Sequence, residues 1–285
     1  MNAEPSCPTV TVLLPVFNAD RYISKSIDSI LCQSWESFEL LILDDGSTDN
    51  TRDIIRSYQD ERIRLVVCEH NYIQTLNTGI DLSKGKYIAR MDADDIMYPD
   101  RLRVQVSLLE EEPEIALCST WMRMFDMAKG VSRIGQSLAG VIENPILPLL
   151  ESNFIAHPTV MIRKEFLCKN SLYYSTDYPY AEDYKLWVDM ALAGAVFYIE
   201  PEPLLHYRVH NEQVSQKNLK TQRESSIRVQ KEIISHLLLT EPYSSLSKIY
   251  AEIVELERQG FISSHDSPKF ISPFIHKLSH ATLTQ

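Results

Sequence analysis

Residues 10–17 read VTVLLPVF, a short and continuous apolar run in which β-branched residues are frequent. Such a run, ended here by the polar Asn18, is typical of a strand that is buried on both faces of a sheet. A second run of the same kind, FELLIL, occupies residues 38–43 and ends at an acidic pair. Two further strands are predicted at residues 63–67 and 86–90.

Apolar residues at helical spacing separate these strands. They predict helices over residues 22–31 and 73–82, and another around residues 54–58. Strands that alternate with helices in this way indicate an α/β fold, with a mostly parallel sheet flanked by helices. Ligands of such sheets bind beyond the carboxyl ends of the strands. The polar residues expected at those ends are Asn18, Asp44, Asp45, Asp92, Asp94 and Asp95.

Composition excludes several classes of protein. The chain has 285 residues, of which 44% are apolar and 24% charged, so it can bury a sizeable core. Its net charge of 28 − 39 = −11 argues against a nucleic-acid partner. The five cysteines show neither zinc-ligand spacing nor the pattern of a disulfide framework. Because no apolar run is long enough to span a bilayer, we expect a cytoplasmic protein, or one in peripheral contact with the inner face of the membrane.

The sequence MDADD at residues 91–95 is the sharpest chemical feature of the chain. Three carboxylates in four residues repel one another unless a cation or solvent screens them. Carboxylate oxygens are ligands suited to Mg²⁺ or Mn²⁺, which commonly take their other ligands from substrate phosphates. The alternative is a solvated acidic turn before a helix that begins at Pro99. The acidic pair that ends the second strand favours the metal interpretation.

Four motifs resemble family 2 glycosyltransferases of the GT-A fold. They are PVFNAD at 15–20, LILDDGSTD at 41–49, GKYIARMDADD at 85–95 and AEDYKLWVDM at 181–190. The resemblance implies a Rossmann-like nucleotide-binding half and an inverting transfer of sugar from a UDP-sugar donor. It also implies an acceptor hydroxyl on a glycan or a lipid-linked oligosaccharide, and help from Mn²⁺ or Mg²⁺. A role in polysaccharide biosynthesis is expected on the same ground.

The resemblance carries site roles to individual residues. The positions that match its nucleotide-sugar contacts are Pro15, Val16, Phe17, Asn18, Asp45, Asn71, Asp92, Ala93 and Glu182. Asp94 matches the aspartate that ligates the metal, and His210 lies where some GT-A enzymes place a third metal ligand. This chain departs from many members at Leu76, where they have an arginine, so the contact of that arginine is not carried over.

Asp183 matches the catalytic base of the resembled family. A hydroxyl is a poor nucleophile until its proton is being removed, so the reaction needs such a group. Asp183 is also expected at the start of a helix that runs to Leu192, where the helix dipole favours the ionised carboxylate. The alternative role for Asp183 is to cap that helix.

The rest of the chain divides near residue 215. We expect a catalytic domain over residues 1–215, with an irregular stretch over 121–153, and a helical C-terminal extension over 216–285. Amphipathic helices are predicted at 219–239 and 246–256. They would pack on the core or on a second subunit of a homo-oligomer. Residues 269–277 could instead rest on a membrane, although Pro273 is expected to interrupt a helix there.

Two other functions compete with glycosyl transfer. A sugar-1-phosphate nucleotidyltransferase also combines an α/β sheet with a carboxylate-bound cation, but it normally has a glycine- and arginine-rich loop after its first strand. This chain has no glycine before Gly46. The other candidate is a catalytically inert nucleotide-sugar binder of the same fold, against which the presence of Asp92, Asp94 and Asp183 argues.

Overall fold

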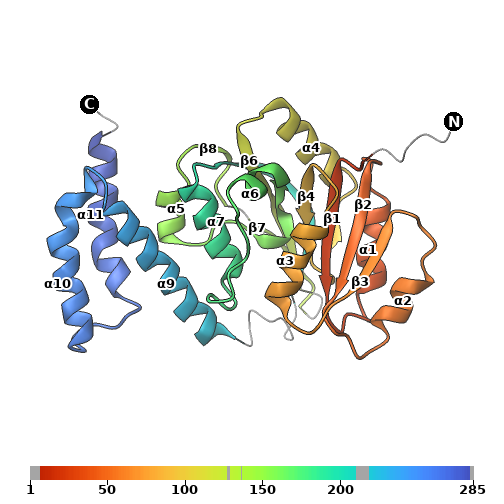
Figure 1. Cartoon of the computed structure of the whole chain (residues 1–285), viewed down its shortest axis with the longest axis horizontal. Helices are drawn as coiled ribbons and strands as arrows, with labels where there is room; N and C mark the ends of the chain where they lie inside the picture. Colours follow the sequence, from red (N-terminus) through yellow and green to blue (C-terminus); the bar gives the residue numbers. More distant parts are fainter. Residues whose placement is uncertain (1–6, 127–128, 136, 210–217, 283–285) are drawn as a thin grey trace.

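A computed structural model describes residues 7–126, 129–135, 137–209 and 218–282. One open sheet crosses the molecule, with helices on both of its faces, and three C-terminal helices lie together at the end away from β3 (Figure 1). The strands are β1 (Val10–Val16), β2 (Phe38–Asp44), β3 (Ile63–Val67), β4 (Tyr87–Arg90), β5 (Ile96–Met97), β6 (Ile115–Asp126), β7 (Val131–Gly135), β8 (Gly140–Ile142), β9 (Met161–Arg163) and β10 (Val196–Val209). The four strands predicted in the first half of the chain are therefore confirmed.

The order of the strands is β3-β2-β1-β4-β9-β6-β10-β5. The pairs β3–β2, β2–β1 and β1–β4 are parallel, so these strands end at the same edge of the sheet. β9 lies antiparallel between β4 and β6, while β10 is parallel to β6 and antiparallel to β5. The sheet is thus parallel from β3 to β4 and mixed beyond β4, which confirms the expected α/β fold.

Ten α-helices are described among these residues. They are α1 (Ile23–Leu31), α2 (Thr51–Ser57), α3 (Tyr72–Leu82), α4 (Arg101–Glu111), α5 (Ile146–Glu151), α6 (Lys164–Lys169), α7 (Glu182–Leu192), α9 (Leu219–Leu237), α10 (Ser247–Arg258) and α11 (Ser267–Thr282), with 3₁₀ turns η1 (His157–Thr159) and η2 (Tyr243–Leu246). None of the described helices is long and apolar enough to cross a membrane.

Two apolar clusters lie on opposite faces of the sheet. α1 and α4 pack with one set of strand residues, and α3, α5, α7, α9 and α11 pack on the other side. α3 approaches the sheet closely because residue 79 is glycine: a Cβ there would lie 2.3 Å from a methyl carbon of Leu13 and 2.6 Å from one of Leu43. This close packing fixes where α3 begins, which matters for the site described below.

The expectation that residues 121–153 are irregular is wrong in large part. β6 continues to Asp126, β7 and β8 follow, and α5 begins at Ile146. β6 continues because β10 runs beside it for most of its length and β7 pairs with its outer part. Those hydrogen bonds come from segments distant in the sequence, so no local pattern predicts them.

The C-terminal extension contains three helices rather than the two predicted. α9 packs on α5 and α7, and α11 packs on α5, α9 and α10. α11 runs through Pro273, so the expected interruption is also wrong. Ile271 and Ile275 of α11 are fully buried, and this packing outweighs the cost of a proline inside a helix, which is about 3 kcal/mol.

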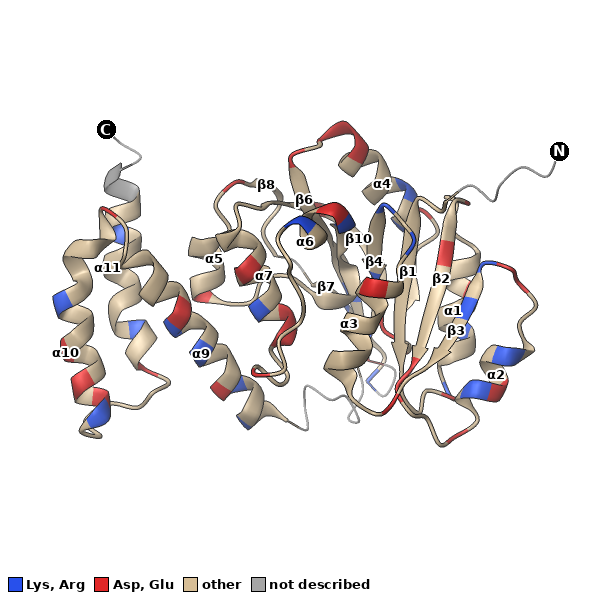
Figure 2. Cartoon of the chain, viewed as in Figure 1, with Lys and Arg blue, Asp and Glu red and all other residues tan. Residues whose placement is uncertain are grey.

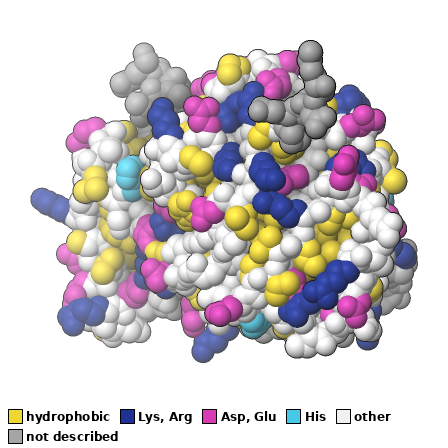
Figure 3. Space-filling model, turned by 45° about the vertical axis from the view of Figure 1, so that its right-hand side comes forward, with side chains coloured by type: hydrophobic (Ala, Val, Ile, Leu, Met, Phe, Trp, Pro, Cys, Tyr) yellow, Lys and Arg dark blue, Asp and Glu magenta, His cyan; other side chains and the backbone are white. Residues whose placement is uncertain are grey.

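The surface of the extension carries charges of both signs. Both basic and acidic residues lie along α9 and α10 (Figure 2). Elsewhere, one face of the molecule presents Lys and Arg side chains next to exposed hydrophobic ones (Figure 3). On α11, Phe270 and Phe274 are 50% and 48% exposed, while the helix buries Ile271 and Ile275 against its neighbours.

The buried face of α11 predicts a stability difference within one helix. Ile271→Ala should lower the free energy of unfolding by about 2–5 kcal/mol, because it removes a fully buried side chain and leaves a cavity. Phe270→Ala, in the next position but half exposed, should change it by less than about 1 kcal/mol. Urea unfolding followed by circular dichroism measures both, and equal effects would contradict this packing.

Candidate active site

The loop after β4, residues 91–95, brings three carboxylates together, and we call it the aspartate loop. One oxygen each of Asp92, Asp94 and Asp95 lies within 4.8 Å of the others. Asp95 is 1% exposed; its Oδ1 accepts a hydrogen bond from the Arg208 backbone N–H at 2.9 Å, and its Oδ2 has no partner among the described residues. Burial and the charges of the neighbouring aspartates raise the pKa of Asp95. A buried carboxylate oxygen without a donor, beside two other carboxylates, fits a divalent cation.

Two arginines lie under this loop. Nη2 of Arg90 is 2.5 Å from Oδ1 of Asp92 and donates to the hydroxyl of Tyr72 at 2.7 Å. Nη2 of Arg101, a fully buried residue of α4, donates to the carbonyl of Arg90 at 2.9 Å. Burial lowers the pKa of Arg101 to about 9. Burial also raises the pKa of Asp92, and so does Asp94, whereas the charge on Arg90 opposes both.

Arg208, at the end of β10, contacts the loop after β4. Nε of Arg208 donates to the carbonyl of Asp94 at 2.8 Å, and its guanidinium lies 4.7 Å from the ring centre of Tyr22 and 4.9 Å from that of Phe125. Arg208 is 4% exposed and therefore belongs to the interior of the site. The predicted metal ligand His210 lies outside the described residues.

The loops after β1 and β2 are joined by side chain to backbone hydrogen bonds. Asn18 has a left-handed backbone, with φ of 49°, and its Oδ1 accepts from the Thr48 N–H at 2.8 Å. The backbone N–H of Asn18 donates in turn to Ser47 Oγ at 3.0 Å. Gly46 has φ of 85°, and a Cβ there would come within 3.2 Å of the His70 Cβ. A left-handed turn with so little room requires glycine.

The carboxylate of Asp45 is buried at this edge of the sheet, with 2% of the residue exposed. Its Oδ1 accepts from the backbone N–H of Asn71 at 2.8 Å and from Thr75 Oγ1 at 2.7 Å. His70 Nδ1 lies 3.0 Å from Oδ2. Asn71 itself caps α3, because its side-chain oxygen accepts from the Gln74 N–H at 3.2 Å.

Phe17 is an exposed aromatic residue at the end of β1. It is 46% exposed, and its ring stacks on His70 with centroids 4.3 Å apart. Pro15 and Val16 precede it in β1 and are buried, so their side chains do not face solvent. Ala93, between the two aspartates of the motif, is partly exposed. An exposed ring beside the polar ends of β1 and β2 offers a flat face for a planar group.

Glu182 and Asp183 form the first turn of α7. Asn153 Nδ2 donates to Oδ2 of Asp183 at 3.1 Å, and the Tyr184 N–H donates to Oδ1 at 2.7 Å. Burial raises the pKa of Asp183, while these two donors favour its charged form. Burial and the charge on Asp183 raise the pKa of Glu182 to about 7. Tyr180, two residues before Glu182, has a left-handed backbone with φ of 63°, a strained conformation of the kind found at functional sites.

Arg90 ends the strand that precedes the three aspartates, and its Nη2 lies 2.5 Å from Oδ1 of Asp92. Its positive charge favours the charged forms of Asp92, Glu182 and Asp183, and so lowers the pKa of each. Phe17, Asn18, Asp45 and Asn71 lie in the loops at the ends of β1 and β2 and at the start of α3.

Several residues of the site were not identified from the sequence. They are His70, Tyr72, Thr75, Arg90 and Asn153. A signal existed for Arg90, because it is a charged residue at the end of a strand predicted to be buried. Asn153 comes from a loop after α5, and nothing in its local sequence indicates that it approaches Asp183. Tyr174 is buried and shares a hydrogen bond of 2.9 Å with His157.

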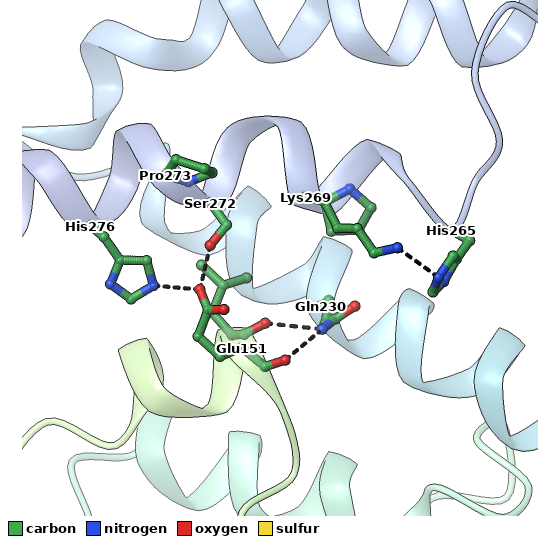
Figure 4. A pocket seen from close by; sticks show the side chains of 9 residues that line it. Glu151, Gln230, His265, Lys269, Ser272, Pro273 and His276 are labelled. Carbon is green, nitrogen blue, oxygen red and sulfur yellow. Dashed lines mark hydrogen bonds and ion pairs between the residues drawn. The ribbon is translucent and has the colours of Figure 1, made fainter.

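Two hollows lie outside this group of residues. A volume of about 360 Å³ is lined by Ile96, Phe125, Ser132 and His206, directly beyond the aspartate loop. A larger one, about 490 Å³, lies where α5, α9 and α11 meet (Figure 4). There Glu151 accepts hydrogen bonds from Ser272 at 2.5 Å and from His276 at 2.6 Å. These bonds join α11 to α5, which indicates a structural contact.

The chain resembles known glycosyltransferases in sequence. The sequence profile of glycosyl transferase family 2 matches residues 11–169. An uncharacterized glycosyltransferase of Haemophilus influenzae is 33% identical over 244 residues, which cover 82% of this chain and 75% of that protein. TuaG of Bacillus subtilis, a glycosyltransferase assigned to teichuronic acid biosynthesis, is 29% identical over 76% of this chain and 86% of its own length.

Solved structures show the same fold. Staphylococcus aureus TarS 1–349 in complex with UDP-GlcNAc superposes with a TM-score of 0.69 at 20% identity, covering 91% of this chain and 73% of that one. The mannosyltransferase PcManGT of Pyrobaculum calidifontis, in complex with GDP-Man and Mn²⁺, gives 0.60 at 16% identity over 97% and 87%. The fold comparison, the extent of the profile match and the identity to the Haemophilus protein agree: the chain belongs to glycosyl transferase family 2.

Proposed function

We propose that this glycosyltransferase moves a sugar from a UDP-sugar to a hydroxyl of a glycan or a lipid-linked oligosaccharide, with inversion at the anomeric carbon. The observation that supports this most strongly is the cluster of Asp92, Asp94 and Asp95 after β4, in which one oxygen of each carboxylate lies within 4.8 Å of the others. A second pair of carboxylates, Glu182 and Asp183, begins α7, and burial raises the pKa of both.

The donor would lie along the ends of β1, β2 and β4. The exposed ring of Phe17 offers a face for the base, and Asp45 and Asn71 lie beside it. The Asp92 carboxylate and Ala93 would contact the ribose or the sugar. The complexes of TarS with UDP-GlcNAc and of PcManGT with GDP-Man support a nucleotide-sugar donor in this fold. Transfer of a hexose or an N-acetylhexosamine is our proposal for the sugar class.

Asp94 would hold Mn²⁺ or Mg²⁺, with His210 as a further predicted ligand. The unpartnered Oδ2 of Asp95 adds a third candidate. When bound, such a cation neutralises the charge that develops on the departing diphosphate. The residues of this chain supply the geometry: Arg208 fixes the Asp94 carbonyl and the Asp95 carboxylate, so the loop is held before any ligand arrives.

Asp183 would accept the proton of the acceptor hydroxyl. Asn153 and the Tyr184 N–H each donate to one of its oxygens, which orients the carboxylate and favours its charged form. Burial, together with the charge on Asp183, raises the pKa of Glu182 to about 7. A Glu182 carboxyl that keeps its proton near neutral pH can donate a hydrogen bond to the donor sugar.

The extension over 216–285 completes this proposal. We assign residues 1–215 to the catalytic domain and the extension to a helical addition that packs on α5 and α7. If the acceptor is lipid-linked, the half-exposed Phe270 and Phe274 of α11 are the side chains that would touch the inner face of the membrane. The same exposed face would serve a homo-oligomer, and sedimentation with and without liposomes separates the two.

Removal of the proposed metal ligand tests the donor site. Calorimetry of the wild-type protein should show UDP binding that requires Mn²⁺, and Asp94→Ala should weaken it at least about tenfold, because the cation joins the protein to the diphosphate. Asp53→Ala removes an exposed carboxylate of α2 and should leave the affinity unchanged. Equal binding by wild type and Asp94→Ala would exclude Asp94 as the ligand, and UDP release from a panel of UDP-sugars distinguishes an enzyme from an inert binder.

The hydrogen bond that Asn153 donates to Asp183 predicts the direction in which a variant shifts the pH dependence of the reaction. Asn153→Ala removes a hydrogen bond to the charged carboxylate, so the pKa of Asp183 should rise. Since the base must be ionised, the acid limb of kcat/KM should move to higher pH by up to about one unit, which corresponds to about 1.4 kcal/mol. Activity well above that limb should change little.

The matched control is Asn170→Ala, which removes a hydrogen bond to the Phe166 carbonyl in α6 and should leave the pH profile unchanged. Asp183→Asn should reduce kcat by at least about a hundredfold at every pH. An acid limb that stays in place in the Asn153 variant, or an active Asp183→Asn enzyme, would contradict the assignment of the base.

A further inference from the structure

Arg90 is an unusual residue for its position. It ends β4, a strand buried on both faces, and only 3% of it is exposed. Its backbone is fixed on both sides, because its N–H donates to the Val160 carbonyl at 3.0 Å and its own carbonyl accepts from Arg101. A buried guanidinium is costly unless its charge is compensated. The fold therefore keeps this charge for a reason other than packing.

Of the three guanidinium nitrogens of Arg90, only Nη2 has a partner among the described residues. Nη2 contacts both Oδ1 of Asp92 and the hydroxyl of Tyr72, whereas Nε and Nη1 are buried without a partner among the described residues. Asp92 is thus the carboxylate that neutralises the guanidinium. One of its two oxygens is already engaged by a cation that belongs to the protein.

This contact makes the aspartates of the loop unequal. Asp95 accepts a hydrogen bond from a neutral backbone N–H, but Asp92 faces a full positive charge at 2.5 Å. A second cation placed on Asp92 would be repelled by Arg90, because two positive charges would then share one carboxylate in a site of low dielectric. The remaining Asp92 oxygen is suited to a neutral donor such as a hydroxyl.

We propose that Arg90 is a positioning residue that keeps Asp92 off the metal and directs its carboxylate to the hydroxyl groups of the nucleotide-sugar. The inference rests on the proposed function for the identity of the donor, although its effect on the cation does not. Tyr72, at the start of α3, holds the guanidinium in place from the other side.

The test compares Mn²⁺ binding, without nucleotide, in four proteins: the wild type, Arg90→Met, Asp92→Asn and the double variant. Arg90→Met should bind Mn²⁺ about tenfold more tightly, because Asp92 loses its partner and becomes a ligand. Asp92→Asn should bind it more weakly, since the charge of Arg90 is left uncompensated. The double variant removes both charges and should return to within about threefold of the wild type.

The double variant shows whether Asp92 is a metal ligand in the native protein. If Asp92 is a metal ligand in the native protein, losing its carboxylate should weaken Mn²⁺ binding at least about tenfold even when Arg90 is also absent. That result, an unchanged affinity in Arg90→Met, or a lack of Mn²⁺ binding in every protein, would overturn the proposal. Replacing a buried ion pair by two neutral residues is usually tolerated, and thermal melting verifies that each variant is folded.

Two further variants guard against a purely structural role. Arg90→Lys keeps a charge beside Asp92 and should keep the Mn²⁺ affinity of the wild type. Arg64→Met removes a cation paired with Glu39 at 3.1 Å, near the opposite end of β2, and should leave Mn²⁺ binding unchanged. Tighter binding in Arg64→Met would show that net charge alone explains the effect.

UDP binding in the presence of Mn²⁺ separates this inference from the proposed function. Arg90→Met should bind UDP-sugar about tenfold more weakly than the wild type while it binds Mn²⁺ more tightly. The reason is that Asp92 then ligates the metal and no longer contacts the hydroxyl groups of the nucleotide-sugar. A wild-type protein that binds Mn²⁺ but no UDP would contradict the proposed donor. In that case the comparison of the four proteins with Mn²⁺ alone still decides whether Arg90 keeps Asp92 off the metal.

Discussion

Charge compensation beneath the β4 loop is the constraint on which the rest of the site depends. Three carboxylates converge within 4.8 Å at the end of a buried strand, which is unfavourable in an interior of low dielectric. Two buried arginines offset this repulsion from below, Arg90 through Asp92 and Arg101 through the carbonyl at the end of the strand. Arg101 also donates to the Val160 carbonyl at 3.2 Å, so the residue that supports the loop also joins β4 to the segment before β9. The same side chains therefore compensate the charge of the carboxylates and hold neighbouring segments of the sheet together.

The parallel half of the sheet turns this local arrangement into a site for an extended ligand. β1, β2 and β4 end at one edge, so their loops lie next to one another. The loops after β1 and β2 are tied together by Asn18, Ser47 and Thr48 and hold little freedom of their own. A rigid edge of this kind lowers the entropy lost when a ligand with several flexible bonds is bound.

The sequence predicts the parallel half well because its information is local. Continuous apolar runs, polar residues at their ends and helical spacing between them indicate β1 to β4 and α1 to α3 without any distant contact. The mixed half is different: β6, β7, β8 and β10 are stabilised by one another across long separations, and residues 121–153 were wrongly expected to be irregular. The acidic residues of the site were apparent as motifs. Arg90 and Asn153 were not, because their importance comes from the carboxylates that the fold places beside them. The length of α11 was missed for the same reason, since burial of Ile271 and Ile275 overrides the preference of Pro273.

The hydrogen bond from the Arg208 N–H to Asp95 joins residues separated by 113 positions. The aspartate loop is thus assembled from a turn made early in synthesis and a strand made much later. Until β10 has been synthesised, the bonds from Arg208 to the Asp95 carboxylate and to the Asp94 carbonyl cannot form. The loop therefore reaches its native geometry only when β10 has joined the sheet beside β6.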